Sequence, residues 1–203
     1  MHTAVVDYEG GNLRSVETAL RRLEADFETT SSPERVRAAD KVIFPGVGDA
    51  KAAMDVLNGK GLSDALRDFF ATGKPMLGIC VGSQIVLDAS EERSAVGLGI
   101  VPGTARRFPE RPGLKVPHMG WNSVEYREGD YLFAGIPRGS SFYFVHSYYP
   151  DPVDRESWIG WSDYEQSFCA ALAWQNLRAT QFHPEKSGRY GLELLRNFLL
   201  HAE

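Results

Sequence analysis

The sequence is poor in cysteine. Its 203 residues include only Cys80 and Cys169. Two cysteines do not make the disulfide framework of a small secreted domain, and neither a Cys-x-x-Cys pair nor a histidine spacing typical of zinc sites is present. We therefore expect a reduced, cytosolic (cytoplasmic) protein with no metal and no cofactor, in which a free thiol stays available for chemistry.

Long apolar runs and basic runs are also missing. No segment approaches the roughly 20 apolar residues that cross a bilayer, and a strand pattern begins at Thr3, so we expect neither a membrane span nor a signal peptide. The formal net charge of -5 and the absence of a basic run disfavour nucleic-acid binding, and no Walker-type phosphate loop is present. The length suits one domain spanning 1–203.

Cys80 stands in the most informative stretch, Gly78-Ile79-Cys80-Val81-Gly82. The apolar run 75–79 predicts a buried strand that ends at this cysteine, and 81–87 predicts the start of a helix. Gly-x-Cys-x-Gly is the cysteine form of the nucleophile elbow, in which the glycines leave room for a sharp turn. The helix start would favour a thiolate. Taken alone, the stretch fits a buried structural cysteine equally well, and that is our interpretation of Cys169.

A second motif, Gln181-Phe182-His183-Pro184-Glu185, follows the strand-like segment 177–180. A cysteine nucleophile needs a base, and the base needs an orienting acceptor. Pro184 favours an extended His183, and side chains two residues apart in an extended segment share a face, so Glu185 can accept the ring N–H of His183. The tripeptide alone is a weak signal, since His183 could simply end a strand. Together with the elbow cysteine it predicts a catalytic triad.

The order of predicted elements indicates an α/β fold. Strands are predicted in the first half at 3–6, 27–30, 41–44 and 75–79. Helices are predicted between them at 13–23, from 32 onward, at 50–57 and at 62–70. This alternation predicts a mostly parallel central sheet with helices on both faces. Additional strands are predicted in the second half at 141–149, 158–161 and 168–174, with a loop over 102–117 and a closing helix at 190–200.

These residues resemble class I (triad-type) glutamine amidotransferases. Three stretches match motifs of that class: the elbow with Gln84, His183-Pro184-Glu185, and Phe44-Pro45-Gly46-Val47-Gly48. The run Pro117-His118-Met119-Gly120-Trp121-Asn122 is similar to the marker of the glutaminase subunits of imidazole glycerol phosphate synthase. Asp7-Tyr8, Gly11-Asn12-Leu13 and 144–148 are similar to that family as well. The resemblance covers nearly the whole chain.

The resemblance implies a flavodoxin-like amidotransferase fold and the hydrolysis of glutamine. Cys80 would attack the amide carbon, His183 would activate it and then protonate the leaving ammonia, and Glu185 would orient His183. The backbone amides of Val47 and Val81 would form the oxyanion hole, because the developing charge needs donors. The residues implied in glutamine binding are Gln84, Ser147 and Tyr148.

The resemblance also implies a partner. Ammonia would pass to a separate TIM-barrel protein, the cyclase subunit, which makes imidazole glycerol phosphate and aminoimidazole carboxamide ribotide in histidine biosynthesis. The two proteins would form a heterodimer. The residues expected at the interface are Asn12, Met119 and Trp121, with His118 on the same side. Trp121 could instead be a core anchor, and we interpret His146 as a core histidine.

Two residues depart from the family pattern. Glu9 stands where the family usually has glycine, and Ser83 where it usually has methionine. Neither belongs to the triad, but both bear on local geometry, at the partner face and in the glutamine pocket respectively.

Three other functions compete with this interpretation. The glutaminase partner of a pyridoxal phosphate synthase is disfavoured by the marker at 117–122. A pseudo-glutaminase that only docks on a partner is disfavoured because all three triad residues are present. A free-standing cysteine hydrolase of γ-glutamyl peptides is disfavoured by the marker and by the short chain.

Overall fold

The computed structural model describes residues 1–9 and 12–201. The alternation predicted for the first half is confirmed. Its strands are β1 (Thr3–Val6), β2 (Phe27–Thr30), β3 (Lys41–Gly46) and β4 (Met76–Cys80). Its helices are α1 (Leu13–Arg22), α2 (Pro33–Ala38), α3 (Ala50–Gly59) and α4 (Leu62–Ala71). Local chemistry sets these boundaries: Ser32 caps α2 by accepting the Arg35 backbone N–H at 3.3 Å, and Pro33 occupies the first turn.

The second half is richer in strands. After the short helix α5 (Val81–Ile85) come β5 (Leu87–Ser90), β6 (Ala95–Val96), β7 (Val101–Arg107), β8 (His118–Tyr126), β9 (Ser140–His146), β10 (Tyr148–Pro152), β11 (Trp158–Asp163), β12 (Ser167–Trp174) and β13 (Leu177–Thr180). The closing helix is α6 (Gly188–Leu200), as expected. Single turns of 3₁₀ helix lie at Glu92–Ser94, Tyr131–Phe133, Arg155–Ser157 and Pro184–Lys186.

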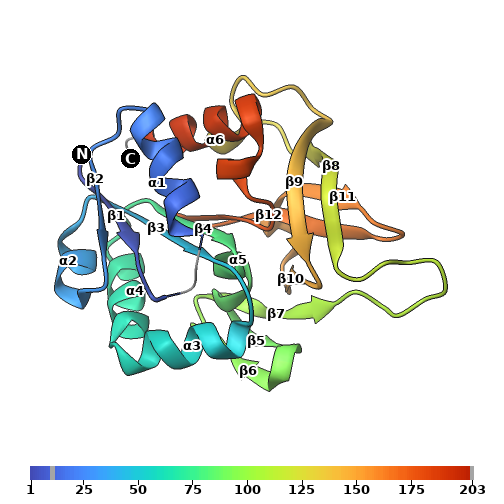
Figure 1. Cartoon of the computed structure of the whole chain (residues 1–203), viewed down its shortest axis with the longest axis horizontal. Helices are drawn as coiled ribbons and strands as arrows, with labels where there is room; N and C mark the ends of the chain where they lie inside the picture. The colour runs from blue at the N-terminus through green and yellow to red at the C-terminus, as the bar shows by residue number, and fades with distance from the viewer. Residues whose placement is uncertain (10–11, 202–203) are drawn as a thin grey trace.

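A nine-stranded sheet, in the order β2-β1-β3-β4-β13-β12-β11-β8-β9, runs through the described residues. Its strands pair in parallel from β2 to β13 and antiparallel from β13 to β9. The α/β fold is therefore confirmed, but only one half of the sheet is parallel. Figure 1 shows α1 and α6 on one face and α2, α3 and α4 on the other. Strands β1, β3 and β4 are buried throughout because both faces are covered.

A smaller sheet, in the order β10-β7-β5-β6, corrects one prediction. The segment from 102 begins as strand β7, not as a loop. Pro102 and Gly103 do not prevent pairing, because β5 and β10 flank the strand and Val101 and Ala105 are buried. A Cβ at Gly103 would lie 2.7 Å from the backbone oxygen of Asp151, so a residue read as a breaker serves close strand packing.

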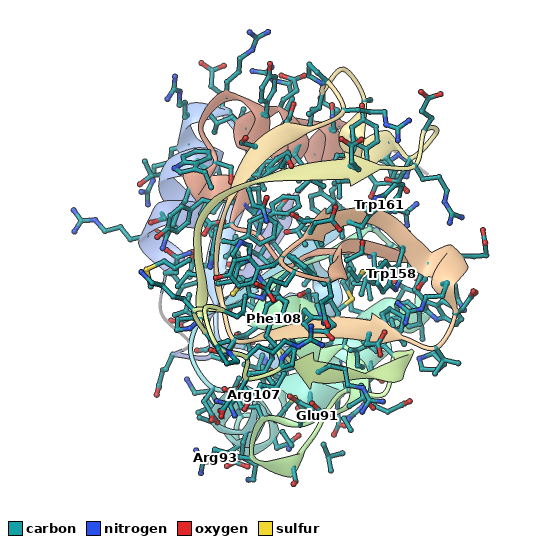
Figure 2. All side chains as sticks on the ribbon, turned by 90° about the vertical axis from the view of Figure 1, so that its right-hand side faces the viewer. Glu91, Arg93, Arg107, Phe108, Trp158 and Trp161 are labelled. Carbon is teal, nitrogen blue, oxygen red and sulfur yellow. The ribbon has the colours of Figure 1, made fainter. Side chains whose placement is uncertain are left out.

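The small sheet is linked to the loop that follows β5. Arg107, at the end of β7, lies beside Glu91 (Figure 2), and its backbone N–H donates to a Glu91 carboxylate oxygen at 2.8 Å.

A buried lysine ties β3 to the last helix. Lys41 is 1% exposed, and its ammonium donates to the carbonyls of Phe198 (2.9 Å), Leu199 (2.8 Å) and His201. The last carbonyls of a helix have no intrahelical donor, and a cation also suits the negative end of the helix dipole. Burial lowers the pKa of Lys41. None of the described helices has the length and apolarity to span a membrane.

Candidate active site

Cys80 lies where strand β4 turns into helix α5. Its φ of 54° and ψ of -108° are rare for a residue with a side chain, and a nucleophile elbow imposes such strain. A Cβ at Gly78 would lie 2.9 Å from the Gly82 oxygen, and one at Gly82 would lie 2.3 Å from the Phe44 oxygen. The predicted sharp turn and the helix start at Val81 are confirmed. The helix is short, however, and residue 87 already belongs to β5.

His183 and Glu185 follow β13, which pairs in parallel with β4, so they lie at the same end of the sheet as Cys80. His183 Nδ1 is 2.7 Å from Glu185 Oε1, and both side chains are fully buried. A carboxylate only accepts hydrogen bonds, so Nδ1 carries the proton and Nε2 is the basic nitrogen of the neutral ring. Among the described residues, neither His183 Nε2 nor Glu185 Oε2 has a hydrogen-bond partner.

The surroundings of His183 increase its proton affinity. Burial by itself lowers the pKa of His183, but the adjacent Cys80 and the hydrogen bond and charge of Glu185 raise it to about 10. A basic imidazole next to a cysteine can accept the thiol proton and leave a nucleophilic thiolate.

Asn12 lies against this pair. Its side-chain amide donates to Glu185 Oε1 and is 3.3 Å from His183 Nδ1. Sequence reasoning expected Asn12 only at a partner interface, and that role stays a prediction. Gly11, its neighbour in the same motif, lies outside the described residues.

Two glutamines connect the thiol to the pocket wall. The Gln84 amide donates to the Tyr148 carbonyl and to the Gln181 side-chain oxygen, both at 2.9 Å. The Gln181 amide nitrogen is 3.7 Å from Cys80 Sγ. Both amide hydrogens of Gln84 are thus in use, and its Oε1 is the atom that can accept from a ligand. Ser83 donates to the Cys80 backbone oxygen at 2.7 Å, so this departure from the family pattern supports the elbow.

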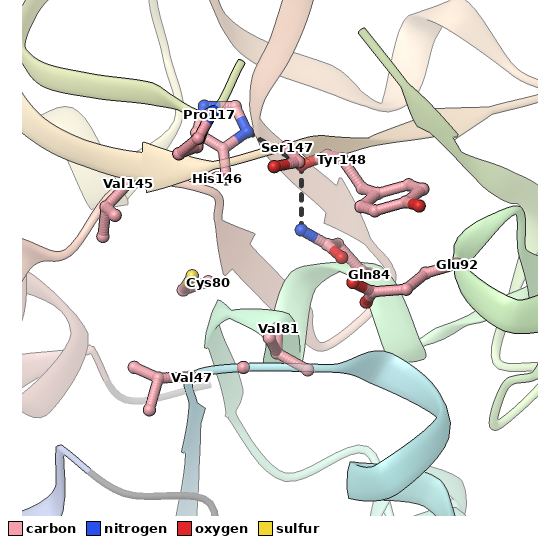
Figure 3. Close-up of a pocket in the computed structure, with 11 residues that line it drawn as sticks. Val47, Cys80, Val81, Gln84, Glu92, Pro117, Val145, His146, Ser147 and Tyr148 are labelled. Carbon is pink, nitrogen blue, oxygen red and sulfur yellow. Dashed lines mark hydrogen bonds between the residues drawn. The ribbon is translucent and has the colours of Figure 1, made fainter.

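A cavity of 250 Å³ opens in front of Cys80 (Figure 3). The residues that line it are Val47, Gly48, Cys80, Val81, Gln84, Glu92, Pro117, Val145, His146, Ser147 and Tyr148. The structure therefore brings together around one cavity the nucleophile, both candidate oxyanion residues and all three residues expected to bind glutamine. The volume suits a small molecule.

Sequence reasoning missed Glu92 and Gln181. Glu92 lines the cavity, with Gln84 between it and Cys80 in Figure 3. One of its oxygens accepts the Ala50 backbone N–H at 2.7 Å, and burial raises the pKa of its carboxyl. No sequence motif indicates a role for Glu92, because it reaches the cavity through the path of β5 and the 3₁₀ turn that begins at Glu92. Gln181, in contrast, stands inside the His183 motif and was open to recognition.

Strand β8 contains the family marker and divides it between two faces. Met119 is 63% exposed and Trp121 is 59% exposed, so Trp121 is not a core anchor. His118 is only 4% exposed, and the expectation that it faces a partner is wrong. Successive side chains of a strand point to opposite faces, which separates His118 from Met119.

The loop after β1 explains the other departure. Glu9 has a φ of 65°, a conformation that glycine adopts without strain. Its backbone N–H donates to Asp7 at 2.9 Å, and its carboxylate pairs with Lys60 at 2.9 Å. Within residues 1–9 and 12–201, no cluster of histidine, cysteine, aspartate and glutamate is arranged to hold a metal ion.

Comparison with known proteins agrees with this geometry. The family model "Glutamine amidotransferase class-I" matches residues 4–202. Imidazole glycerol phosphate synthase subunit HisH of Dehalococcoides mccartyi is 48% identical over 196 residues, covering 96% of this chain and 95% of the relative. The HisH subunit of Nitrosospira multiformis is 49% identical over 205 residues, covering 97% and 96%. The chain belongs to the HisH family of class I glutamine amidotransferases.

Solved structures confirm the expected fold of this class. A glutamine amidotransferase from Thermotoga maritima superposes with a TM-score of 0.70 at 15% identity, covering 98% of this chain and 96% of that one. PurLQS from Thermotoga maritima gives a TM-score of 0.75 at 17% identity, covering 98% and 97%. At these identities the likeness shows the fold alone.

Proposed function

We propose that this chain hydrolyses glutamine to glutamate and ammonia as the glutaminase subunit of an imidazole glycerol phosphate synthase. The observation that carries the proposal is the strained Cys80 at one sheet end with the buried His183–Glu185 pair. Membership of the HisH family supports it, as does a match to the amidotransferase model over residues 4–202, which also supports one domain spanning 1–203.

In the proposed mechanism His183 Nε2 accepts the thiol proton and the Cys80 thiolate attacks the amide carbon of glutamine. The carbonyl oxygen becomes an oxyanion, stabilised by the backbone N–H groups of Val81 and Val47. When the C–N bond breaks, protonated His183 gives its proton to the departing ammonia, leaving a thioester. His183 then deprotonates a water molecule, which attacks the thioester and releases glutamate and the thiol. Glu185 keeps the Nδ1–H in place throughout.

Glutamine is held by its α-ammonium group, on the Glu92 side of the cavity. The Glu92 carboxylate and the Oε1 atom of Gln84 are acceptors suited to the α-ammonium group. Ser147 and Tyr148 form the facing wall. This arrangement directs the side-chain amide of the substrate toward Cys80.

The partner is a cyclase subunit, bound as a heterodimer through the face that presents Asn12, Met119 and Trp121. Exposed methionine and aromatic side chains are enriched at interfaces, which supports this assignment. The ammonia serves the synthesis of imidazole glycerol phosphate in histidine biosynthesis, and we propose the cytoplasm as the site of action.

The test is glutamine hydrolysis by the purified chain, alone and with a cyclase subunit plus its ribonucleotide substrate. Strong stimulation that Cys80→Ala abolishes would support both the chemistry and the partner. The matched control is Cys169→Ala, which removes the other buried cysteine and should retain activity. High activity without the cyclase, unchanged by its addition, would keep the glutaminase and remove the proposed partner.

A further inference from the structure

A chain of hydrogen bonds joins strand β8 to the cavity. The Asn122 side-chain nitrogen is 3.3 Å from His118 Nε2, and His118 Nδ1 is 3.0 Å from His146 Nε2. His146 Nδ1 is 2.7 Å from the Tyr148 carbonyl oxygen. That oxygen also accepts the Gln84 amide at 2.9 Å, and both bonds are visible in Figure 3. The chain of hydrogen bonds thus runs through two histidines with buried side chains and ends at the Tyr148 carbonyl, in the wall of the cavity.

The chemistry of the groups fixes the direction of every bond in this chain. A carbonyl can only accept, so the proton between His146 and Tyr148 is on His146 Nδ1. In a neutral ring His146 Nε2 is then an acceptor, which requires His118 to donate from Nδ1. His118 Nε2 must accept in turn, and the Asn122 amide supplies the donor. Burial lowers the pKa of His118 to about 4 and that of His146 to about 3, so both rings are neutral at pH 7.

The surrounding rings hold this arrangement. The His118 ring stacks on Tyr164 at 4.1 Å between centroids, and Phe168 contacts both histidine rings edge-on or tilted at 5.7 and 5.3 Å. Phe108, labelled in Figure 2, packs against both as well. The packing leaves the imidazoles little freedom, so His146 donates in one fixed direction.

We propose that His146, held as a donor by His118, is a positioning residue that sets the affinity for glutamine by fixing the Tyr148 carbonyl and with it the Ser147–Tyr148 wall. The inference rests on the proposed function. His146 does not touch the reacting atoms. It acts through the backbone that lines the cavity and through Gln84, which binds the same carbonyl oxygen.

The test compares the KM and kcat of glutamine hydrolysis, in the complex with a cyclase subunit, for two substitutions. His146→Leu removes the donor, and KM should rise roughly tenfold, as expected for one lost hydrogen bond, while kcat changes by less than about threefold. His146→Asn places an amide N–H near the position of Nδ1 and should recover KM to within about threefold of the original value. A purely structural role would not be rescued in this way.

Two further variants complete the test. His118→Phe keeps the ring packing and removes the donor to His146, so its KM should lie between those of the original protein and His146→Leu. If His146→Leu does not fold, His118→Phe becomes the decisive variant. Phe133→Leu truncates a buried ring that stacks on Tyr126 and is not among the rings around His118 and His146, so it should lower Tm and leave KM unchanged. An unchanged KM in His146→Leu, or an equal rise in Phe133→Leu, would overturn the inference while leaving the glutaminase intact. An unsubstituted complex that does not hydrolyse glutamine would overturn the proposed function, and the inference with it.

Discussion

The parallel and antiparallel halves of the large sheet contribute different things to the site. Strands β3, β4 and β13 are parallel neighbours, and their carboxyl ends carry the reactive groups: Val47 follows β3, Cys80 ends β4, and His183 lies three residues after β13. The opposite wall of the cavity lies where the antiparallel half meets the small sheet: Val145 and His146 end β9, Ser147 follows, and Tyr148 begins β10. Parallel strands converge on one sheet edge and so gather reactive groups there, whereas the antiparallel strands present a shaped surface. The comparison suggests that one half controls turnover and the other controls binding.

The largest effect should come from the tip of β4. Cys80→Ser should reduce kcat on the order of 10⁴-fold or more, because a hydroxyl is a far weaker nucleophile than a thiolate in this setting. Circular dichroism and Tm should show a folded protein. Near-normal turnover in a folded variant would break the assignment of chemistry to the parallel half.

The next largest difference separates two residues after β13. His183→Ala should reduce kcat nearly as much as Cys80→Ser is expected to. The reduction in Glu185→Gln should be about a hundredfold smaller, since the amide oxygen can still accept the Nδ1 hydrogen bond. Steady-state kcat values for both variants test this ranking. If Glu185→Gln proved the worse of the two, Glu185 would do more than orient the ring.

A binding residue should respond differently. Glu92→Gln preserves an acceptor for the Ala50 N–H but removes the negative charge, and KM for glutamine should rise roughly 10- to 100-fold with little change in kcat. Glu91→Gln is the matched control, because Glu91 pairs with Arg106 outside the cavity and should leave KM unchanged. A fall in kcat at constant KM would contradict the assignment of Glu92 to substrate binding.

The smallest effect concerns stability in the antiparallel half. His118 and His146 have folded pKa values lowered from 6.5 to about 4 and about 3, so the unfolded chain binds more protons as pH falls below 6.5. Stability is thus lost as pH falls through this window, by about 2 kcal/mol per histidine between pH 6.5 and 5. His183 acts in the opposite sense: Cys80 and Glu185 raise its folded pKa to about 10, so the stability it contributes is fully present below pH 6.5 and is not lost on acidification. Urea unfolding at pH 7 and pH 5 measures the loss, and His118→Phe should reduce it; an unchanged difference would refute the assignment.

Sequence reasoning recovered the two halves unequally, for a physical reason. In the parallel half, apolar runs, caps and glycines near Cys80 are local signals, and the parallel pairing of the strands follows from their alternation with helices. In the small sheet, β7 was read as a loop because its Pro102 and Gly103 are tolerated only through pairing with distant strands. His118 was placed outside because the register that turns it inward is a tertiary property. Glu92 reaches the cavity by a path that no spacing predicts.

The clamp of Lys41 on the end of α6 has a practical consequence for handling the protein. Proteolytic trimming that removes the residues after 198 would delete two of the three carbonyls that solvate a buried ammonium group. The catalytic residues would survive such a cut, but Lys41 would hold β3 and α6 together less firmly. Loss of the last few residues during storage would therefore appear as lowered heat resistance before any change in the chemistry.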